Sequence, residues 1–326
     1  MNRRKCLAIL SAVVACGLFT LGAERPQEDS ARVHAKVLHS SSTFGNIYTW
    51  AGNTPTWNQK LHVSGYRIGC ATEDAAACLH RGLDIVRQEQ VKKIIISIPI
   101  DPSRTADDAL AYSQLSLSNP FLVEVSFDDF VGRYSRLFSE ENISPSSWLQ
   151  AVVRNFKAKN PALEFGITLY EDDLQSPYLR EPYVPKEVSQ SINDVHLYLH
   201  YRENVPNYKS YVQQAKVLFP NAKIIAGSYA YDRVNYIPCT PSDKQPCSPE
   251  KEIALYEKAI GVEAQLLKQG FISGIEFFPG FFGMENEWQG WKDPSYCDPA
   301  RVQECIKNTL IMRQAAAETL NTTIGW

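Results

Sequence analysis

Short apolar segments alternate with longer amphipathic stretches along most of this chain. Each short segment is rich in β-branched and aromatic residues and runs into a polar or acidic end, which is the pattern of a buried strand. These predicted strands lie within 91–101, 121–130, 162–174, 192–204, 222–233 and 271–283. Between them, apolar residues at helical spacing predict helices within 146–160, 208–219, 248–270 and 299–320.

Repeated strand–helix units of this kind predict an α/β fold, in which helices cover a parallel sheet. One or two further strands are expected within 32–68, with 32–40 and 61–68 as candidates. The total number of predicted strands favours a single closed (β/α)8 barrel of the TIM type, irregular in its first strands, over an open doubly wound sheet. The sequence has no GxGxxG turn or GxxxxGK loop to support a nucleotide-binding version of the open sheet.

The N-terminus has the plan of a secretory signal. Three basic residues at 3–5 precede an apolar run that turns polar after Ala23. Residues 13–16 resemble the box of a bacterial lipoprotein signal, so lipid attachment at Cys16 and simple cleavage near Ala23 both stay open. We therefore expect a signal over 1–23, one barrel domain over 24–326, and an exported protein that is periplasmic, extracellular or at the cell surface. A membrane is expected as a partner only through the N-terminal lipid.

Six cysteines follow the signal, in three pairs that are each separated by eight positions. The pairs are Cys70 and Cys78, Cys239 and Cys247, and Cys297 and Cys305. An even count in an exported chain without a CxxC pair favours disulfides over a metal site. Local pairing is a hypothesis, favoured for the second pair because prolines at 238, 241 and 246 prevent a regular element there. For the third pair, a helix from Pro299 would place Cys305 about 10 Å away along its axis.

Composition narrows the class of partner. At 326 residues and a hydrophobic fraction of 44%, the chain can bury a core of barrel size. Its net charge of −3 comes from well-mixed signs, without a long basic run or a stripe of arginine and lysine. We therefore expect no nucleic-acid partner.

Consecutive carboxylates end two neighbouring predicted strands, in FDDF at 127–130 and LYEDDL at 169–174. Barrels of this kind keep their chemistry where the parallel strands stop. Any one acid could instead cap the following helix, but two such clusters favour a functional site. Strand alternation places Val123, Val125 and Phe127 toward the helices and the intervening residues inside. The predicted inward set is Asp101, Glu124, Ser126, Asp128, Thr168, Tyr170, Asp172, Asp194, His196, Tyr198, His200, Glu276 and Phe278, with Glu171 kept beside Asp172 because strand ends re-aim side chains.

Aromatic residues gather on the loops around these acids, at Trp50, Trp57, Trp288 and Trp291 and within 227–236 and 276–288. Sugar rings stack on aromatic faces, while their hydroxyl groups need charged or polar acceptors. The pattern predicts a carbohydrate site, for which the expected binding residues are Asp129, Tyr170, His196, Tyr198, His200, Tyr229 and Trp288. A metal site that includes both histidines is disfavoured, because strand residues four apart lie about 13 Å from each other. No metal and no cofactor are expected.

These motifs resemble the glycoside hydrolase superfamily of (β/α)8 barrels over about residues 30–320. The resemblance rests on FDDF and LYEDDL at successive strand ends and on GIEFFPG at the last strand. It implies hydrolysis by two carboxyl groups, one protonated and one ionised. We expect Glu171 or Asp172 as the acid and Asp128 or Glu276 as the ionised partner. In another form of this mechanism, one acid protonates the leaving oxygen and its neighbour orients a substrate acetamide. The adjacent acids of both FDDF and LYEDDL would suit it.

Two familiar signatures of the superfamily are absent: an Asn-Glu pair on the fourth strand and a DxxDxDxE run. A non-catalytic carbohydrate-binding barrel at the cell surface therefore stays open beside an exported hydrolase of poly- or oligosaccharides. A metal-dependent hydrolase is the third alternative.

The cysteine pattern gives a first testable prediction. We expect no thiol in the mature protein, with Cys239 joined to Cys247. Mass spectrometry of a non-reduced tryptic digest measures this directly. Recovery of either cysteine in alkylated form, or joined to a distant cysteine, would contradict the local pairing.

Overall fold

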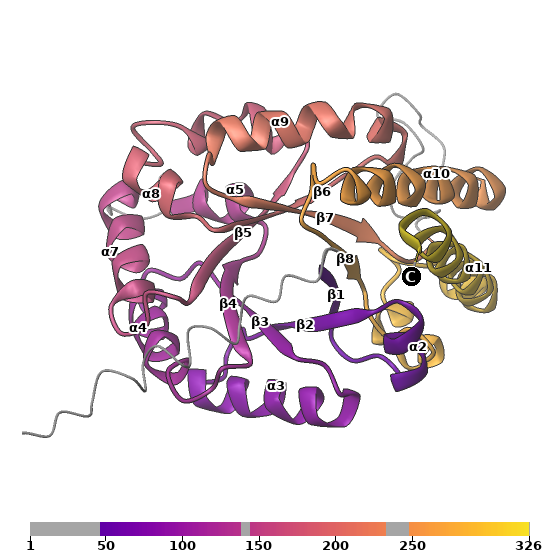
Figure 1. Cartoon of the computed structure of the whole chain (residues 1–326), viewed down its shortest axis with the longest axis horizontal. Helices are drawn as coiled ribbons and strands as arrows, with labels where there is room; N and C mark the ends of the chain where they lie inside the picture. Colours follow the sequence, from indigo (N-terminus) through magenta and orange to yellow (C-terminus); the bar gives the residue numbers. More distant parts are fainter. Residues whose placement is uncertain (1–45, 138–143, 233–247, 326) are drawn as a thin grey trace, which may run out of the picture. The chain divides into compact units, whose positions relative to one another are not determined.

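The computed structural model describes residues 46–137, 144–232 and 248–325, which contain a closed barrel of eight parallel strands (Figure 1). The strands follow one another in chain order around the barrel, and the first pairs with the last. They are β1 (Asn46–Trp50), β2 (Val63–Gly69), β3 (Lys93–Ile98), β4 (Leu122–Phe127), β5 (Glu164–Tyr170), β6 (Asp194–Tyr198), β7 (Lys223–Tyr229) and β8 (Gly274–Phe278). The predicted (β/α)8 barrel is confirmed.

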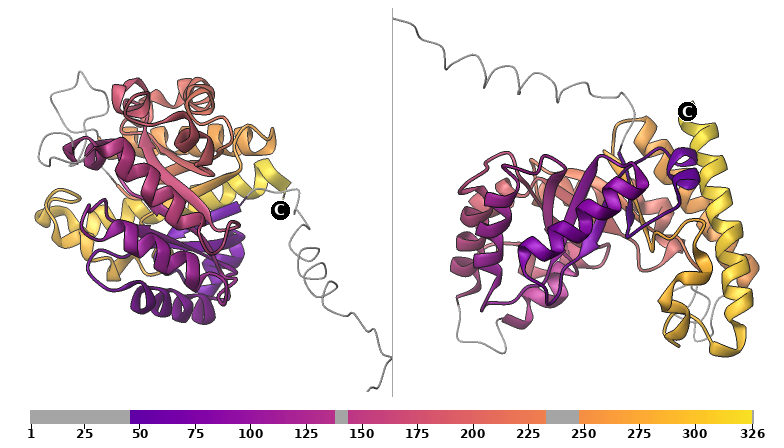
Figure 2. Two further views of the ribbon diagram at one scale, coloured as in Figure 1. Left: turned by 90° about the vertical axis from the view of Figure 1, so that its left-hand side faces the viewer. Right: turned by 90° about the horizontal axis from the view of Figure 1, so that it is seen from below.

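Helices surround the strands in all three views (Figures 1 and 2). They are α2 (Pro55–Lys60), α3 (Ala75–Glu89), α4 (Thr105–Leu115), α5 (Phe130–Tyr134), α7 (Pro145–Lys157), α8 (Lys186–Ser191), α9 (Tyr208–Leu218), α10 (Pro249–Lys268) and α11 (Val302–Leu320). Short 3-10 helices lie in the loops at Asp173–Gln175, Pro177–Leu179, Arg202–Asn207, Glu285–Glu287, Gln289–Lys292 and Pro299–Arg301, and a π turn lies at Asn321–Gly325. Within the described parts of the chain, no helix combines the length and apolar character needed to cross a membrane.

The first two strands were only partly foreseen. β2 matches the candidate at 61–68, whereas β1 lies at 46–50, and the candidate at 32–40 is outside the described residues, as is the signal. β1 escapes a search for apolar runs because its five residues include Asn46 and Thr49. The pairing of β1 with β2 shifts register between Ile47 and Tyr48, in line with the irregularity expected there.

Strand alternation builds two separate interiors. Side chains on the outer face, such as Val125, Phe127 and Leu197, join the large apolar core that packs against the helices. Inward side chains instead form a polar layer on the barrel axis, above a small apolar cluster of Tyr48, Ile95 and Ile225. Val123, expected on the helix side, packs against that inner cluster. A register shift between β3 and β4 at this point turns the side chain inward, and the expectation for Val123 was wrong.

Two of the three predicted local disulfides lie within the described residues and are confirmed. Cys70 joins Cys78 with a Cα–Cα distance of 5.9 Å, and Cys297 joins Cys305 at 6.5 Å. The larger separation expected for the second of these was wrong, because the α-helix begins at Val302 rather than at Pro299. Cys239 and Cys247 lie outside the described residues, so their pairing stays a prediction.

A glycine on β7 gives a test of the packing. A Cβ atom at Gly227 would overlap the ring of Tyr198 on the neighbouring strand β6. We expect Gly227→Ala to lower the free energy of unfolding by about 1–3 kcal/mol, as overpacking does. Urea unfolding measures the effect. The matched control is Gly261→Ala on α10, where a Cβ meets no atom within 4 Å and helix propensity favours alanine. Equal stability of Gly227→Ala and wild type would contradict the packing.

Candidate active site

A chain of buried charges crosses the barrel axis. The carboxylate of Glu276 on β8 lies 3.0 Å from Arg67 on β2 and 3.1 Å from the Nδ1 atom of His196 on β6. The Nε2 atom of His196 lies 2.9 Å from Glu124 on β4. Arg67 also donates to the hydroxyl of Thr168 on β5 at 2.7 Å. Five strands are therefore linked by one polar network whose four ionisable side chains are at most 2% exposed.

The charges in this network are fixed by mutual contact. Burial raises the pKa of Glu276, but His196, Arg67 and the Tyr198 hydroxyl outweigh it and bring that pKa to about 2. Burial likewise lowers the pKa of His196, while Glu276 and Glu124 raise it to about 10. At neutral pH we therefore infer an ionised Glu276 beside an imidazolium.

Glu276 supports the floor of the site. Its Oε1 atom accepts hydrogen bonds from the Tyr198 hydroxyl at 2.7 Å and from the Trp50 indole at 3.1 Å, in addition to Arg67. The Arg67 guanidinium also lies over the Trp50 ring, 4.3 Å from its centroid. Since the Glu276 side chain is 0% exposed, it acts on the cavity above through Tyr198 and Trp50.

The two acids after β4 stand at the mouth of the barrel. One Asp128 oxygen lies 4.0 Å from Arg67 and the other 3.7 Å from Arg133, and the side chain is 30% exposed. Asp129 adopts a left-handed backbone conformation with φ of 48° and accepts the Tyr170 hydroxyl at 2.7 Å. Burial raises the pKa of Asp128, and the nearby arginines offset this only in part. A carboxyl group with a raised pKa beside a second acid suits proton transfer.

An aromatic cavity of about 160 Å³ opens above these acids. Its walls include Trp50, Tyr170, Tyr198, Tyr229 and Phe278, which come from β1, β5, β6, β7 and β8. Within the described ranges, the carboxylates that line it are Asp128 and Asp129. The Tyr229 hydroxyl donates to that of Tyr170 at 3.2 Å, and Tyr170 donates to Asp129. The cavity therefore combines aromatic faces with two acids and several hydroxyl groups.

The acids after β5 lie elsewhere. Glu171 accepts hydrogen bonds from the backbone N–H groups of His200 at 2.7 Å and Tyr201 at 3.2 Å, and from Asn204 at 3.0 Å. Asp172 is 67% exposed and lies 3.2 Å from His200. Ligand atoms of Glu171, Asp172 and His200 come within 4.8 Å of one another, so this group could hold a cation. Both Glu171 oxygens already accept N–H groups, which favours a role in fastening the loop after β6.

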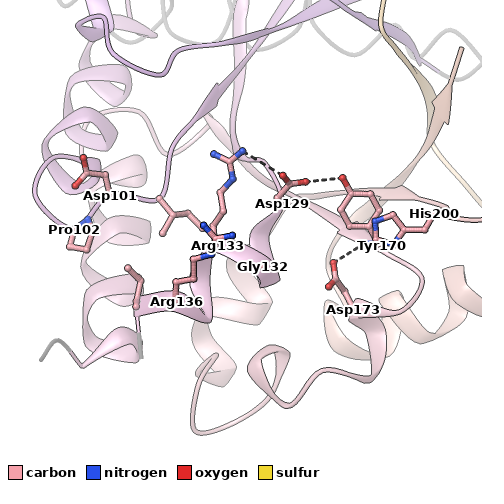
Figure 3. A pocket seen from close by; sticks show the side chains of 11 residues that line it. Asp101, Pro102, Asp129, Gly132, Arg133, Arg136, Tyr170, Asp173 and His200 are labelled. Atoms are coloured by element: carbon pink, nitrogen blue, oxygen red, sulfur yellow. Dashed lines mark hydrogen bonds and ion pairs between the residues drawn. The ribbon is translucent and has the colours of Figure 1, made fainter. Parts of the chain in front are cut away.

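A wider groove, shown in Figure 3, shares lining residues with the aromatic cavity. It has a volume of about 760 Å³ and runs over the ends of β3, β4 and β5. Asp129 and Tyr170 line both spaces, so the groove and the cavity meet at these two residues. Asp101, expected to face inward, and His200 line this groove rather than the aromatic cavity.

Sequence patterns located part of this site. Asp128, Asp129, Tyr170, Tyr198 and Tyr229, which the sequence predicts as site residues, lie together around the cavity. Trp288 does not line the cavity; it is packed behind it in a second aromatic cluster with Tyr231 and Trp291. His196 and Glu276 face inward as expected but lie beneath the cavity floor.

The residue that sequence reasoning missed is Arg67. The signal was a charged residue between the apolar residues Tyr66 and Ile68, on the opposite face of the strand. Trp50 and Phe278, by contrast, were noted among the aromatic positions and the inward set, but their place in the cavity depends on β1 and β8 being neighbours.

Comparisons with known proteins support the fold. No protein-family model matches the chain, and no curated protein matches it. A glucosidase from Croceicoccus marinus superposes with a TM-score of 0.54 at 12% identity, over 85% of this chain and 68% of that one. A GH18 chitinase from Pseudoalteromonas aurantia gives a TM-score of 0.49 at 12% identity, over 81% of this chain and 99% of that one. The chain has the (β/α)8 barrel fold found in glycoside hydrolases.

The buried charges give a prediction for pH. The two neighbouring carboxylates raise the pKa of His196 from its ordinary value of 6.5 to about 10, so between these two pH values the folded state keeps a proton that the unfolded state loses. Stability should fall by up to about 1.4 kcal/mol per pH unit as pH rises through that window. In His196→Asn we expect this slope to become shallower by the His196 contribution, with the part that comes from Glu263 retained, and the stability at pH near 6 to drop by about 3–5 kcal/mol.

Urea unfolding of wild type and variant across this pH range measures the difference. His80→Asn is the control, since His80 is 73% exposed on α3 and its removal should leave the slope unchanged. A difference between wild type and His196→Asn that stays constant with pH would show that His196 is not held as a cation.

Proposed function

We propose that this protein is an exported glycoside hydrolase that cleaves a poly- or oligosaccharide, with Asp128 and Asp129 as its working acids. The observation that carries the proposal is the aromatic cavity at the C-terminal mouth of the barrel, lined by this adjacent pair of carboxylates. Aromatic faces offer stacking surfaces to a sugar ring, and the tyrosine hydroxyls offer hydrogen bonds to its hydroxyl groups.

Asp128 is the proton donor in this proposal. Burial raises the pKa of Asp128, which favours the protonated form that an acid must have. As the glycosidic C–O bond breaks, its electron pair goes to the leaving oxygen, which takes the proton from Asp128. Water then supplies a hydroxyl group to the sugar carbon, and its remaining proton restores the carboxylic acid.

Asp129 is the ionised partner. It accepts the Tyr170 hydroxyl at 2.7 Å and lies 3.5 Å from Arg133, so its side chain is fixed beside the cavity. A negative charge beside the sugar opposes the positive charge that develops on the ring as the bond breaks. Where the sugar carries an acetamido group, the role of the same carboxylate is to orient it.

Export is part of the proposal. The N-terminal residues have the plan of a secretory signal, and the disulfides Cys70–Cys78 and Cys297–Cys305 suit an oxidising compartment. The substrate is then a glycan met outside the cytoplasm, and the protein reaches a membrane only if Cys16 carries a lipid.

The test is substitution of Asp128. We expect Asp128→Asn to lower turnover of a cleaved glycan by about a hundredfold or more, as loss of a general acid does, with little change in melting temperature. The matched control is Asp172→Asn, which removes the same charge from the next strand end but outside the cavity. Its turnover should stay within about threefold of wild type.

The pH profile adds a second readout. Because Asp128 must be protonated, kcat/KM should fall as pH rises through its pKa, and this limb should be absent in Asp128→Asn. Loss of activity in Asp172→Asn with wild-type turnover in Asp128→Asn would move the acid to β5. Binding of glycans without release of reducing ends by the wild type would instead identify a carbohydrate-binding barrel.

A further inference from the structure

The groove beside the aromatic cavity has the size and the chemistry of a second binding region. The aromatic cavity, at about 160 Å³, has room for a single sugar ring, whereas the groove is about 760 Å³. That larger volume falls in the range of about 300–1,000 Å³ typical of small-molecule sites. Because the two spaces share Asp129 and Tyr170, a ligand with one ring in the cavity has a direct route into the groove.

We infer that the groove holds the continuing chain of a neutral, hydroxyl-rich oligosaccharide, running from the aromatic cavity past Asp129 and over Gly132 on α5. This inference rests on the proposed function for the placement of a sugar ring in the cavity. It adds the direction in which the chain leaves and the kind of sugar that follows.

The charges of the groove select a neutral chain. Asp101, Asp129 and Asp173 face the same space as Arg133 and Arg136 (Figure 3). A polyanion would meet three carboxyl groups and a polycation two guanidinium groups, so either would bring like charges together. Hydroxyl groups both donate and accept hydrogen bonds, and they suit a surface on which donors and acceptors alternate.

The groove also offers a stacked pair of rings next to the cavity. The rings of Tyr170 and His200 stack at 3.9 Å with an interplanar angle of 10°, and both residues line the groove. Tyr170 is held by its hydrogen bonds to Asp129 and Tyr229. A sugar that follows the first one therefore meets a fixed aromatic edge before it reaches the arginines.

A substitution at Gly132 can fill the groove without filling the aromatic cavity. It lines the groove, and a Cβ atom built there meets no atom within 4 Å, so a larger side chain would project into open space. In Gly132→Phe we expect the advantage of long over short substrates in kcat/KM to fall by about tenfold or more. The control Gly261→Phe places the same ring on α10, where a Cβ also meets no atom within 4 Å, and should keep the wild-type ratio.

The probes are cello- and chito-oligosaccharides from monomer to hexamer, tested for hydrolysis and, by calorimetry, for binding. The inference predicts tighter binding or faster cleavage of the longer chains by wild type, and loss of this gain in Gly132→Phe. An unchanged dependence on length in Gly132→Phe, or none in the wild type, would overturn it. Length-dependent binding that Gly132→Phe abolishes, without any hydrolysis, would support the groove and refute the proposed hydrolase.

Discussion

The charge-balanced chain of Glu124, His196, Glu276 and Arg67 is the constraint on which the site depends. Four buried ionisable groups are costly to remove from water, and they are tolerated here because each acidic side chain lies at about hydrogen-bond distance from a basic one. Removal of one member would leave a buried charge without compensation, a loss of about 3–5 kcal/mol in comparable cases. These four residues therefore fix the relative placement of the strands that carry the cavity walls.

Glu276 and Arg67, two of the four buried residues, contact side chains that form the cavity. Glu276 fixes the hydroxyl of Tyr198 and the indole of Trp50, and these two rings form part of the floor. Arg67 extends from the same carboxylate toward Asp128, at 4.0 Å, which is close enough to steady it and too far for a strong hydrogen bond. Burial then dominates and raises the pKa of Asp128. We therefore assign a supporting role to Glu276, the deepest acid, and the acid–base steps to Asp128 and Asp129 at the rim.

The fold was predictable from the sequence because the strand–helix alternation repeats often enough to favour a closed barrel, and strand alternation placed His196 and Glu276 inside. Strand alternation predicted the wrong side at two kinds of position. Val123 packs inward because the β3–β4 pairing shifts register there. Asp172 is exposed because it lies beyond the end of β5. Arg67 shows the remaining limit. Its sequence position marks it as unusual, but its partners lie 209 and 101 residues away, and only the closed barrel brings them together.

The most direct measurement is a crystal structure of the Asp128→Asn variant soaked with an oligosaccharide that the wild type cleaves. The account predicts one sugar ring among Trp50, Tyr198 and Tyr229, with the glycosidic oxygen within hydrogen-bond distance of residue 128 and the chain continuing over Gly132. A glycan bound beside Glu171 and Asp172, with the aromatic cavity unoccupied, would contradict it.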